Sequence, residues 1–283
     1  MATPTALPTV RLPDGTLVPA LGMGTWTMGE RAGAAAREVD ALRAGLDLGM
    51  TLIDTAEMYG EGGAEKVVAR ALAGRRDEVF VVSKVYPHNA SAAGTVAACE
   101  RSLARLRTDR LDLYLLHWRG THPLAETVAA FERLRAQGKI LRWGVSNFDV
   151  ADMRELLALP SGANCATNQV LYNVGERGVE WALRPLCQRH GIPLMAYSPF
   201  GQGALLRERK LSKLAAAHGM SPAQLAIAWL LNRDGVIAIP QSSKPAHVAE
   251  CRAAADLRLS PALAAAIDEA FPPPTRATPL AML

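Results

Sequence analysis

The sequence predicts an α/β protein that folds as a (β/α)8 TIM barrel. Short apolar or β-branched segments alternate with longer segments of helical periodicity along almost the whole chain, which is typical of a parallel sheet. There are eight such alternations, and eight is the number that closes into a barrel. The 283 residues fit one barrel, so we expect a single domain over residues 1–283.

The first apolar segment differs from those that follow it. Asp14 and Gly15 separate two short β-like pieces within residues 9–24, and an Asp-Gly pair is typical of a hairpin turn. We therefore expect an N-terminal β-hairpin cap that precedes the repeat.

The repeat itself predicts eight strands and their helices in order. The strand candidates are residues 20–24, 51–55, 79–85, 111–117, 142–147, 166–170, 193–198 and 236–240. The helix candidates between them are residues 34–49, 64–74, 95–107, 124–138, 150–160, 179–191 and 221–233. Several of these end in glycine, as helix C-termini prefer. Residues 247–257 and 260–271 then predict the eighth helix and one extra C-terminal helix, followed by an irregular tail at 272–283.

An open, doubly wound sheet is the rival architecture. It requires a G-x-G-x-x-G fingerprint after the first strand. The sequence at residues 22–27 is GMGTWT, which lacks the third glycine. This disfavours the rival.

Composition excludes several classes of protein. Hydrophobic residues make up 49% and charged residues 20%, which favours a compact fold over disorder. The net charge is +4, but no basic tract of five or more occurs, so we expect no nucleic-acid partner. No signal sequence and no run of 18 apolar residues is present, so we expect a cytoplasmic protein without a membrane segment. The four cysteines lack C-x-x-C spacing, so we expect reduced thiols and no metal.

Reactive side chains lie at the ends of three consecutive strand candidates. Asp54 ends the second, Lys84 lies near the end of the third and His117 ends the fourth, while Tyr59 lies in the loop after the second. The active site of a barrel is built at the carboxyl ends of its strands. We therefore expect these four residues to meet at one rim.

The four residues form a coherent chemical set. An unpaired Lys84 ammonium among valines would be costly to bury, so we expect Asp54 to pair with it. The positive charge beside Tyr59 would lower the phenol pKa from its usual value of about 10 and suit it to act as a general acid. His117 could bond the same carbonyl oxygen. A bound cofactor would then supply the missing hydride.

Each of these residues also has a plainer interpretation when it is taken alone. A strand-end Asp is commonly a cap, a loop Tyr commonly packs, and a His after an apolar strand commonly lies at the rim of the core. Their occurrence at successive strand ends favours the functional interpretation of the whole set.

The order and spacing of several motifs resemble the aldo-keto reductase family across nearly the whole chain. These motifs are GMGTW at 22–26, DTAEMYG at 54–60, SK at 83–84, LHW at 116–118, GVSNF at 144–148, NQ at 168–169 and AYSP at 196–199. The segments GTWTMGE, DTAEMYGEGGAEKVV and CATNQVLYN look most like bacterial methylglyoxal-reducing members.

The resemblance implies a function for particular residues. Asp54, Tyr59, Lys84 and His117 would be the catalytic tetrad, with Tyr59 as the proton donor to a small carbonyl substrate. A nicotinamide cofactor would lie against Thr25, Ser146, Asn147, Gln169, Tyr197, Ser198, Pro199, Gly201, Gly203, Ile239, Gln241, Ser242, Lys244 and His247. Of these, Ser146, Asn147 and Gln169 would bind the carboxamide, Tyr197 would stack on the nicotinamide, and residues 198–203 would follow the pyrophosphate. The substrate pocket would be walled by Trp26, Tyr86 and Trp118. Members of this family are commonly monomers, and we expect the same here.

The sequence departs from the family where the 2′-phosphate of NADPH is usually bound. Gln241 replaces the usual Lys and His247 the usual Arg. Lys244 could act instead as a point charge, with Ser242, Ser243 and the helix N-terminus donating hydrogen bonds; the alternative is that Lys244 is simply solvated. We expect NADPH, with NADH as the alternative cofactor.

The leading hypothesis is an NADPH-dependent reductase of small aldehydes or ketones, with methylglyoxal as one candidate. One rival is a cofactor-binding regulatory or structural module of the same fold with little turnover. A metal-dependent barrel hydrolase is a second rival, but the six histidines form no H-x-H or H-x-x-x-H pair.

Overall fold

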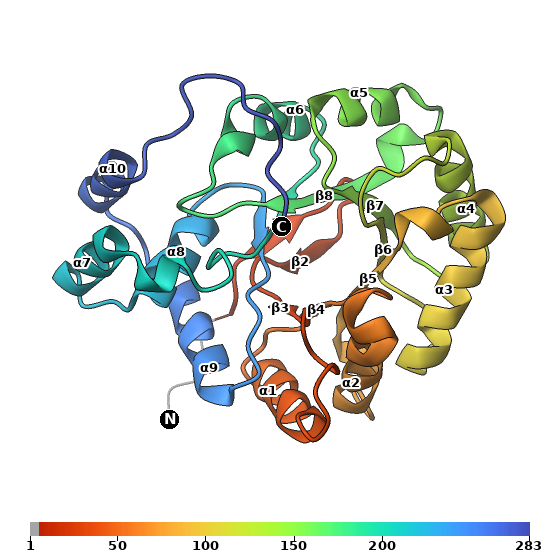
Figure 1. Cartoon of the computed structure of the whole chain (residues 1–283), viewed down its shortest axis with the longest axis horizontal. Coiled ribbons are helices and arrows are strands. Elements are labelled where there is room, and N and C mark those ends of the chain that lie inside the picture. Colours follow the sequence, from red (N-terminus) through yellow and green to blue (C-terminus); the bar gives the residue numbers. More distant parts are fainter. Residues whose placement is uncertain (1–5) are drawn as a thin grey trace.

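The computed structural model describes residues 6–283. Eight parallel strands form one sheet in which each strand pairs with the next along the chain (Figure 1). The strands are β3 (Met23–Gly24), β4 (Leu52–Asp54), β5 (Phe80–Val85), β6 (Leu113–Leu116), β7 (Trp143–Ser146), β8 (Cys165–Leu171), β9 (Leu194–Tyr197) and β10 (Val236–Ala238).

The sheet closes on itself between its first and last strands. Leu21 bridges Ala238 and Gly24 bridges Gln241, both in parallel. The backbone N–H of Gly22 donates to the carbonyl of Ala238 at 2.8 Å, and the N–H of Ala238 donates back to the first strand segment. Gly24 also permits this approach, because a Cβ there would lie 3.0 Å from the carbonyl oxygen of Ile239. The expected (β/α)8 barrel is confirmed.

Helices surround the strands (Figure 1). They are α1 (Ala35–Asp47), α2 (Gly63–Ala71), α3 (Ala92–Leu106), α4 (Leu124–Ala136), α5 (Val150–Ala158), α6 (Leu183–Arg189), α7 (Arg209–Ala217), α8 (Pro222–Leu231), α9 (Pro245–Ala253) and α10 (Pro261–Ala270). Local sequence explains several of their boundaries. For example, α8 begins with a capping box between Ser221 and Gln224, followed by a proline in the first turn.

The predicted hairpin cap is present. Strands β1 (Thr9–Arg11) and β2 (Leu17–Pro19) pair in antiparallel register. The side chains of Val10, Leu12 and Val18 pack against the interior residues of the barrel strands, including Leu52 and Ile237. Leu52 and Ile237 lie at or near the starts of their strands, so the hairpin closes the amino-terminal end of the barrel and leaves the carboxyl-terminal end as its mouth.

Two helical segments differ from the prediction. The helix expected over residues 179–191 is divided into a 3-10 turn at Gly178–Glu180 and the shorter α6. Pro185 lies in the first turn of α6, the part of a helix that tolerates proline, so the helix begins just before it. Helix α7 was not among the expected elements. It buries only Leu211 and Ala215, a stripe too narrow to stand out in the sequence.

The described residues contain neither a disulfide nor a metal-like cluster. All four cysteines are buried and unpaired, and within residues 6–283 no group of three His, Cys, Asp or Glu could hold a metal ion. In the same range no single helix is long and apolar enough to cross a membrane. The bent pair α7 and α8 meets that criterion only when the two are taken together.

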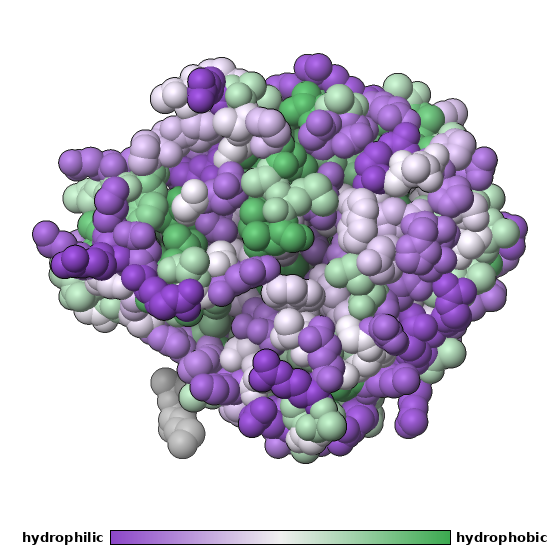
Figure 2. All heavy atoms as spheres, viewed as in Figure 1, coloured by the Kyte–Doolittle hydropathy of each residue, from purple (hydrophilic) through white to green (hydrophobic). Residues whose placement is uncertain are grey.

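The mouth of the barrel is partly covered by the end of the chain. Figure 1 shows the C-terminal segment returning from α10 to the centre of the molecule. In the same view, apolar side chains gather near that centre, and the periphery is mostly hydrophilic (Figure 2). Leu206, Met282 and Leu283 are exposed apolar residues that line a cavity at the mouth of the barrel.

Candidate active site

Three strands and one turn bring the four predicted catalytic residues together. Asp54 is the last residue of β4, Lys84 lies in β5, and His117 directly follows β6. Tyr59 begins a 3-10 turn that leads into α2. All four side chains are at least nine-tenths buried. The predicted convergence at the carboxyl end of the strands is therefore present in the structure.

Lys84 is the centre of this cluster. Its Nζ atom donates to both carboxylate oxygens of Asp54 at 2.8 Å and to the carbonyl oxygen of Thr55 at 2.9 Å. The same atom lies 3.3 Å from the hydroxyl oxygen of Tyr59. The ammonium is fully buried, so its partners replace the water that it has lost.

Asp54 is held from two further directions. Gln169, which lies 115 positions away in β8, donates its amide Nε2 to Oδ1 of Asp54 at 2.8 Å. Thr25 donates its hydroxyl to the backbone carbonyl of Asp54 at 3.0 Å. The contacts of Asp54 with Lys84, Gln169 and Thr25 therefore come from different strands or loops. Together they fix the position of Asp54.

The sequence predicted that Lys84 lowers the pKa of the Tyr59 phenol, and this prediction was wrong. Burial raises the pKa of the Tyr59 phenol well above its ordinary value, and the negative charge of Asp54 raises it further. The nearby Lys84 does not reverse this effect, because Asp54 neutralises its charge at 2.8 Å. Burial also lowers the pKa of Lys84, although Asp54 opposes that shift. Tyr59 is thus a protonated phenol at neutral pH.

His117 is a neutral imidazole. Burial and then the charge of Lys84 hold the pKa of His117 well below its ordinary value. Its Nδ1 atom is buried and has no hydrogen-bond partner among the described residues. The ring packs edge-on against Tyr59 with centroids 5.8 Å apart and lies 4.8 Å from the ring of Trp118.

A cavity of about 620 Å³ opens above this cluster. The predicted residues that line it are Thr25, Trp26, Asp54, Tyr59, Tyr86, His117, Trp118, Asn147, Gln169, Tyr197, Ser198, Pro199, Gly203, Ile239 and Gln241. The predicted residues outside its lining are Lys84, Ser146, Gly201, Ser242, Lys244 and His247. Lys84 lies behind Asp54 and Tyr59, whereas Lys244 and His247 are exposed at the start of α9.

Polar groups on one wall of the cavity are already ordered. Asn147 has a left-handed backbone with φ of 56°. It donates its amide to the carbonyl of His117 at 3.1 Å and accepts from the Tyr197 hydroxyl at 3.0 Å. Ser146 donates to the backbone carbonyl of Gln169. The Oε1 atom of Gln169 has no hydrogen-bond partner in residues 6–283.

The loop after β9 has an unusual backbone. Gly201, Gln202 and Gly203 are consecutive left-handed residues with φ of 52°, 53° and 85°. Glycine adopts this conformation at little cost, which explains two of the three positions. Gln202 and Gly203 line the cavity, so this loop forms part of its wall.

Several lining residues were not predicted. They are Gly24, Thr27, Met58, Phe200, Gln202, Leu206, Met282 and Leu283. Met58 and Phe200 directly adjoin predicted site residues, so proximity in the sequence could have identified them. Met282 and Leu283 belong to the tail, which the sequence predicted only to be irregular. No local pattern indicates where the tail lies.

Residues 241–247, which the sequence predicted to bind the 2′-phosphate, form hydrogen bonds among themselves. Ser242 accepts a hydrogen bond from the backbone N–H of Lys244 at 3.1 Å. Lys244 is the N-cap residue of α9, and its ammonium makes no ion pair with the described residues. Within residues 241–247, only Gln241 lines the cavity.

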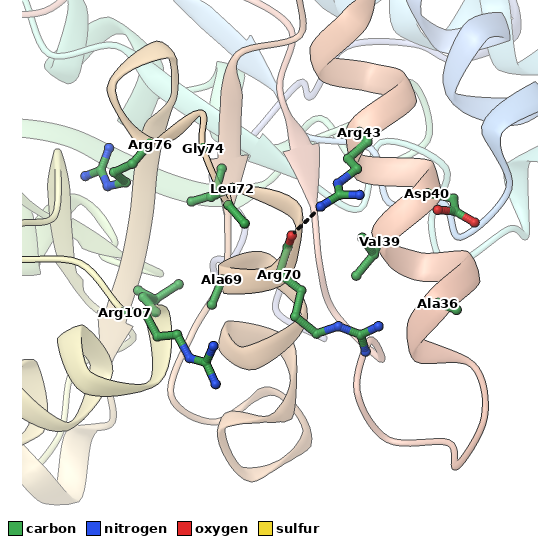
Figure 3. Close-up of a pocket in the computed structure, with 12 residues that line it drawn as sticks. Ala36, Val39, Asp40, Arg43, Ala69, Arg70, Leu72, Gly74, Arg76 and Arg107 are labelled. Atoms are coloured by element: carbon green, nitrogen blue, oxygen red, sulfur yellow. Dashed lines mark hydrogen bonds between the residues drawn. The ribbon is translucent and has the colours of Figure 1, made fainter.

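A second cavity, of about 510 Å³, lies in the outer layer between α1, α2 and the end of α3 (Figure 3). Arg43, Arg70 and Arg107 are exposed at its edge. Arg43 donates to the backbone carbonyl of Arg70 at 3.0 Å, while Arg70 and Arg107 lie in the last turn of α2 and at the end of α3. Cations at these positions offset the exposed carbonyls of helix C-termini, so we interpret this group as stabilising the helix ends.

Comparison with known proteins agrees with the geometry of the barrel mouth. Residues 20–271 match the model of the aldo/keto reductase family. The chain belongs to this family. The resemblance inferred from the motifs is thereby confirmed, and the protein is an aldo-keto reductase.

Individual relatives are similar over almost their full lengths. Methylglyoxal reductase YeaE of Escherichia coli is 54% identical, over 94% of this chain and 95% of the relative. Glyoxal reductase of Bacillus subtilis is 36% identical over 91% of each chain. An aldo-keto reductase from Klebsiella pneumoniae, solved in complex with NADPH, superposes with a TM-score of 0.95 at 50% identity and covers 99% of this chain and 100% of its own.

Proposed function

We propose that this aldo-keto reductase reduces a small aldehyde or ketone to the alcohol with NADPH, and that Tyr59 donates the proton. The observation that supports this most strongly is the buried Lys84–Asp54 pair, whose ammonium lies 3.3 Å from the Tyr59 hydroxyl. Tyr59 and Asp54 line the floor of an open cavity. A buried ion pair with no packing advantage is costly to maintain, so a role in the chemistry explains its presence.

The residues of the cavity fit a nicotinamide dinucleotide. The free Oε1 of Gln169 can accept from a carboxamide, and the ring of Tyr197 supplies a flat wall beside it. A Cβ at Gly203 would meet only a guanidinium nitrogen of Arg207, at 3.7 Å, so the loop leaves room for a phosphate chain. These residues would hold the nicotinamide end of NADPH, and the cofactor would supply the hydride for the carbonyl carbon.

The protein residues provide the acid and the orientation. Tyr59 donates its O–H proton to the carbonyl oxygen as negative charge develops there, because an alkoxide is a stronger base than a phenolate. The Lys84 Nζ atom lies 3.3 Å from the Tyr59 oxygen and can donate a hydrogen bond to the phenolate that remains. We assign the single ring proton of His117 to Nε2, since the buried Nδ1 has no acceptor, and this N–H donates to the same carbonyl oxygen.

The substrate is small because the cavity must hold both reactants. The cavity of about 620 Å³ would have to accommodate the nicotinamide end of the cofactor as well as the carbonyl compound. Tyr86 and Trp118 stand edge to face with centroids 5.1 Å apart, and Met282 and Leu283 add apolar atoms to the rim. We propose an α-oxoaldehyde such as methylglyoxal, which is also the substrate in the name of the E. coli relative.

The preference for NADPH depends on Lys244. Lys244 is the exposed N-cap residue of α9, and its backbone N–H donates to the Ser242 hydroxyl. The positive end of the helix dipole at this position favours a phosphate. This arrangement replaces the two cations that are absent at positions 241 and 247.

The test is a substrate panel with both cofactors, performed on the wild type and on Tyr59→Phe. We expect the wild type to oxidise NADPH with methylglyoxal or another small aldehyde. Tyr59→Phe should lose about 10²–10⁴-fold in kcat and retain NADPH binding measured by fluorescence quenching. A wild type that is inactive toward every carbonyl of the panel would reject the proposal.

A further inference from the structure

The turn that carries Tyr59 is joined to α2 by an unusual backbone. Gly60, Glu61 and Gly62 are three consecutive left-handed residues, with φ of 55°, 51° and 83°. They connect Tyr59 directly to Gly63, the first residue of α2. Since so short a connection leaves little slack, the position of the first turn of α2 sets the position of the Tyr59 side chain.

A fully buried carboxylate ties that first turn to the strand of Lys84. Glu65 lies in the first turn of α2 and is 0% exposed. Its Oε1 accepts a hydrogen bond from the hydroxyl of Ser83 at 2.7 Å. Ser83 precedes Lys84 in β5, and successive strand residues point to opposite faces. Ser83 therefore faces the helices, while Lys84 faces the barrel interior.

The second oxygen of Glu65 is held from α3. Arg105 donates its Nε to Oε2 of Glu65 and an Nη2 hydrogen to Ser102. The Arg105 side chain also passes directly over Gly62, where any Cβ would collide with its Cδ and Nε atoms. Arg105 thus covers the end of the left-handed turn and pairs with the carboxylate that follows it.

We propose that Glu65, Ser83 and Arg105 position Tyr59 against Lys84 for proton transfer. Glu65 connects the first turn of α2 to Ser83, the residue adjacent to Lys84. Arg105 bonds Glu65 and packs against Gly62, at the end of the turn that carries Tyr59. None of the three lines the cavity, so they are positioning residues that act through Tyr59. The charges of Glu65 and Arg105 also lie in the helix layer, where an apolar pair would be cheaper to bury.

This inference rests on the proposed function, and Ser83→Ala tests it. The variant removes one hydroxyl, leaves Lys84 in place and creates little space. We expect kcat to fall about tenfold, which is the lower end of the loss found when the hydrogen-bond partners of metal-ligating residues are removed. KM and the Kd for NADPH should change less than about twofold, because the binding groups are untouched. Ser83→Thr retains the hydroxyl and should recover most of kcat.

The matched control is Ser102→Ala, which makes the same substitution at a second buried serine. Ser102 contacts Arg105 and forms no hydrogen bond with Glu65. It leaves the Ser83–Glu65 bond intact, and we expect wild-type kcat. A purely structural role would change the melting temperature in both variants and leave kcat per folded molecule unchanged, which would overturn the proposal. An inactive wild type would instead reject the proposed function, so the two failures are distinguishable.

Discussion

The two cavities of this protein are similar in size but differ in how they hold charge. The mouth cavity measures about 620 Å³ and the outer one about 510 Å³. At the mouth, Lys84, Asp54 and His117 are buried, and burial shifts the pKa of Lys84 and of His117 downward. In the outer cavity, the guanidinium groups of Arg43 and Arg70 stay in solvent. Buried charge is costly and therefore indicates chemistry, whereas exposed charge at helix ends is inexpensive and indicates stabilisation.

The largest expected difference between the two regions comes from Lys84→Met. Removing one member of a buried pair leaves the Asp54 carboxylate uncompensated, so we expect the free energy of unfolding to fall by about 3–5 kcal/mol. Carbonyl turnover should be lost at the same time. Chemical denaturation and NADPH oxidation measure the two effects. The double variant Lys84→Met, Asp54→Asn should recover much of the stability but not the turnover; recovered turnover would show that the pair is only structural.

Lys244→Ala tests whether charge outside the mouth cavity contributes to cofactor choice. A charge-assisted contact to phosphate contributes about 1.5–3 kcal/mol, so we expect the Kd for NADPH to rise at least about tenfold. The Kd for NADH should not change, because NADH lacks the 2′-phosphate. Lys210→Ala, another exposed lysine, is the control. Equal weakening of both cofactors, or a wild type that prefers NADH, would contradict the assignment.

The buried His117 predicts a pH dependence that the exposed arginines do not produce. Its pKa in the folded protein lies well below the ordinary value of 6.5. Below pH 6.5 the unfolded chain therefore binds a proton that the folded chain excludes, and stability falls as the pH falls. The slope should approach about 1.4 kcal/mol per pH unit for this one group. Unfolding of the wild type and of His117→Asn at several pH values measures it. An unchanged slope in the variant would mean that His117 is not the group responsible.

The smallest effect is expected at the outer cavity. Arg43→Ala removes one hydrogen bond to the end of α2 and should lower the free energy of unfolding by about 0.5–1.5 kcal/mol, with carbonyl turnover unchanged. Thermal unfolding with and without inorganic phosphate provides the measurement. If phosphate stabilised the wild type strongly but not Arg43→Ala, the outer cavity would be an anion site and the comparison between the two regions would fail.

Residues with a strong local signal were placed correctly from the sequence. Asp54, Lys84 and His117 are polar groups at the ends of apolar strands, and strand periodicity alone brings them to one rim. Asp14 and Gly15 predict the hairpin from turn chemistry. Helix α7 was missed because only Leu211 and Ala215 mark its buried face, and the tail was not placed because residues 272–283 carry no periodic pattern.

The sequence by itself determined the barrel, its cap, its family and the meeting of the four predicted catalytic residues at its mouth, since all of these follow from local patterns. Only the tertiary structure decided how those residues behave. Whether Lys84 lowers the pKa of Tyr59 depends on how closely Asp54 neutralises it and how deeply the phenol is buried. The bond from Gln169 to Asp54 spans 115 positions, and Arg105 reaches Glu65 from another helix. Such effects depend on distance and burial in space, which the order of residues along the chain does not contain.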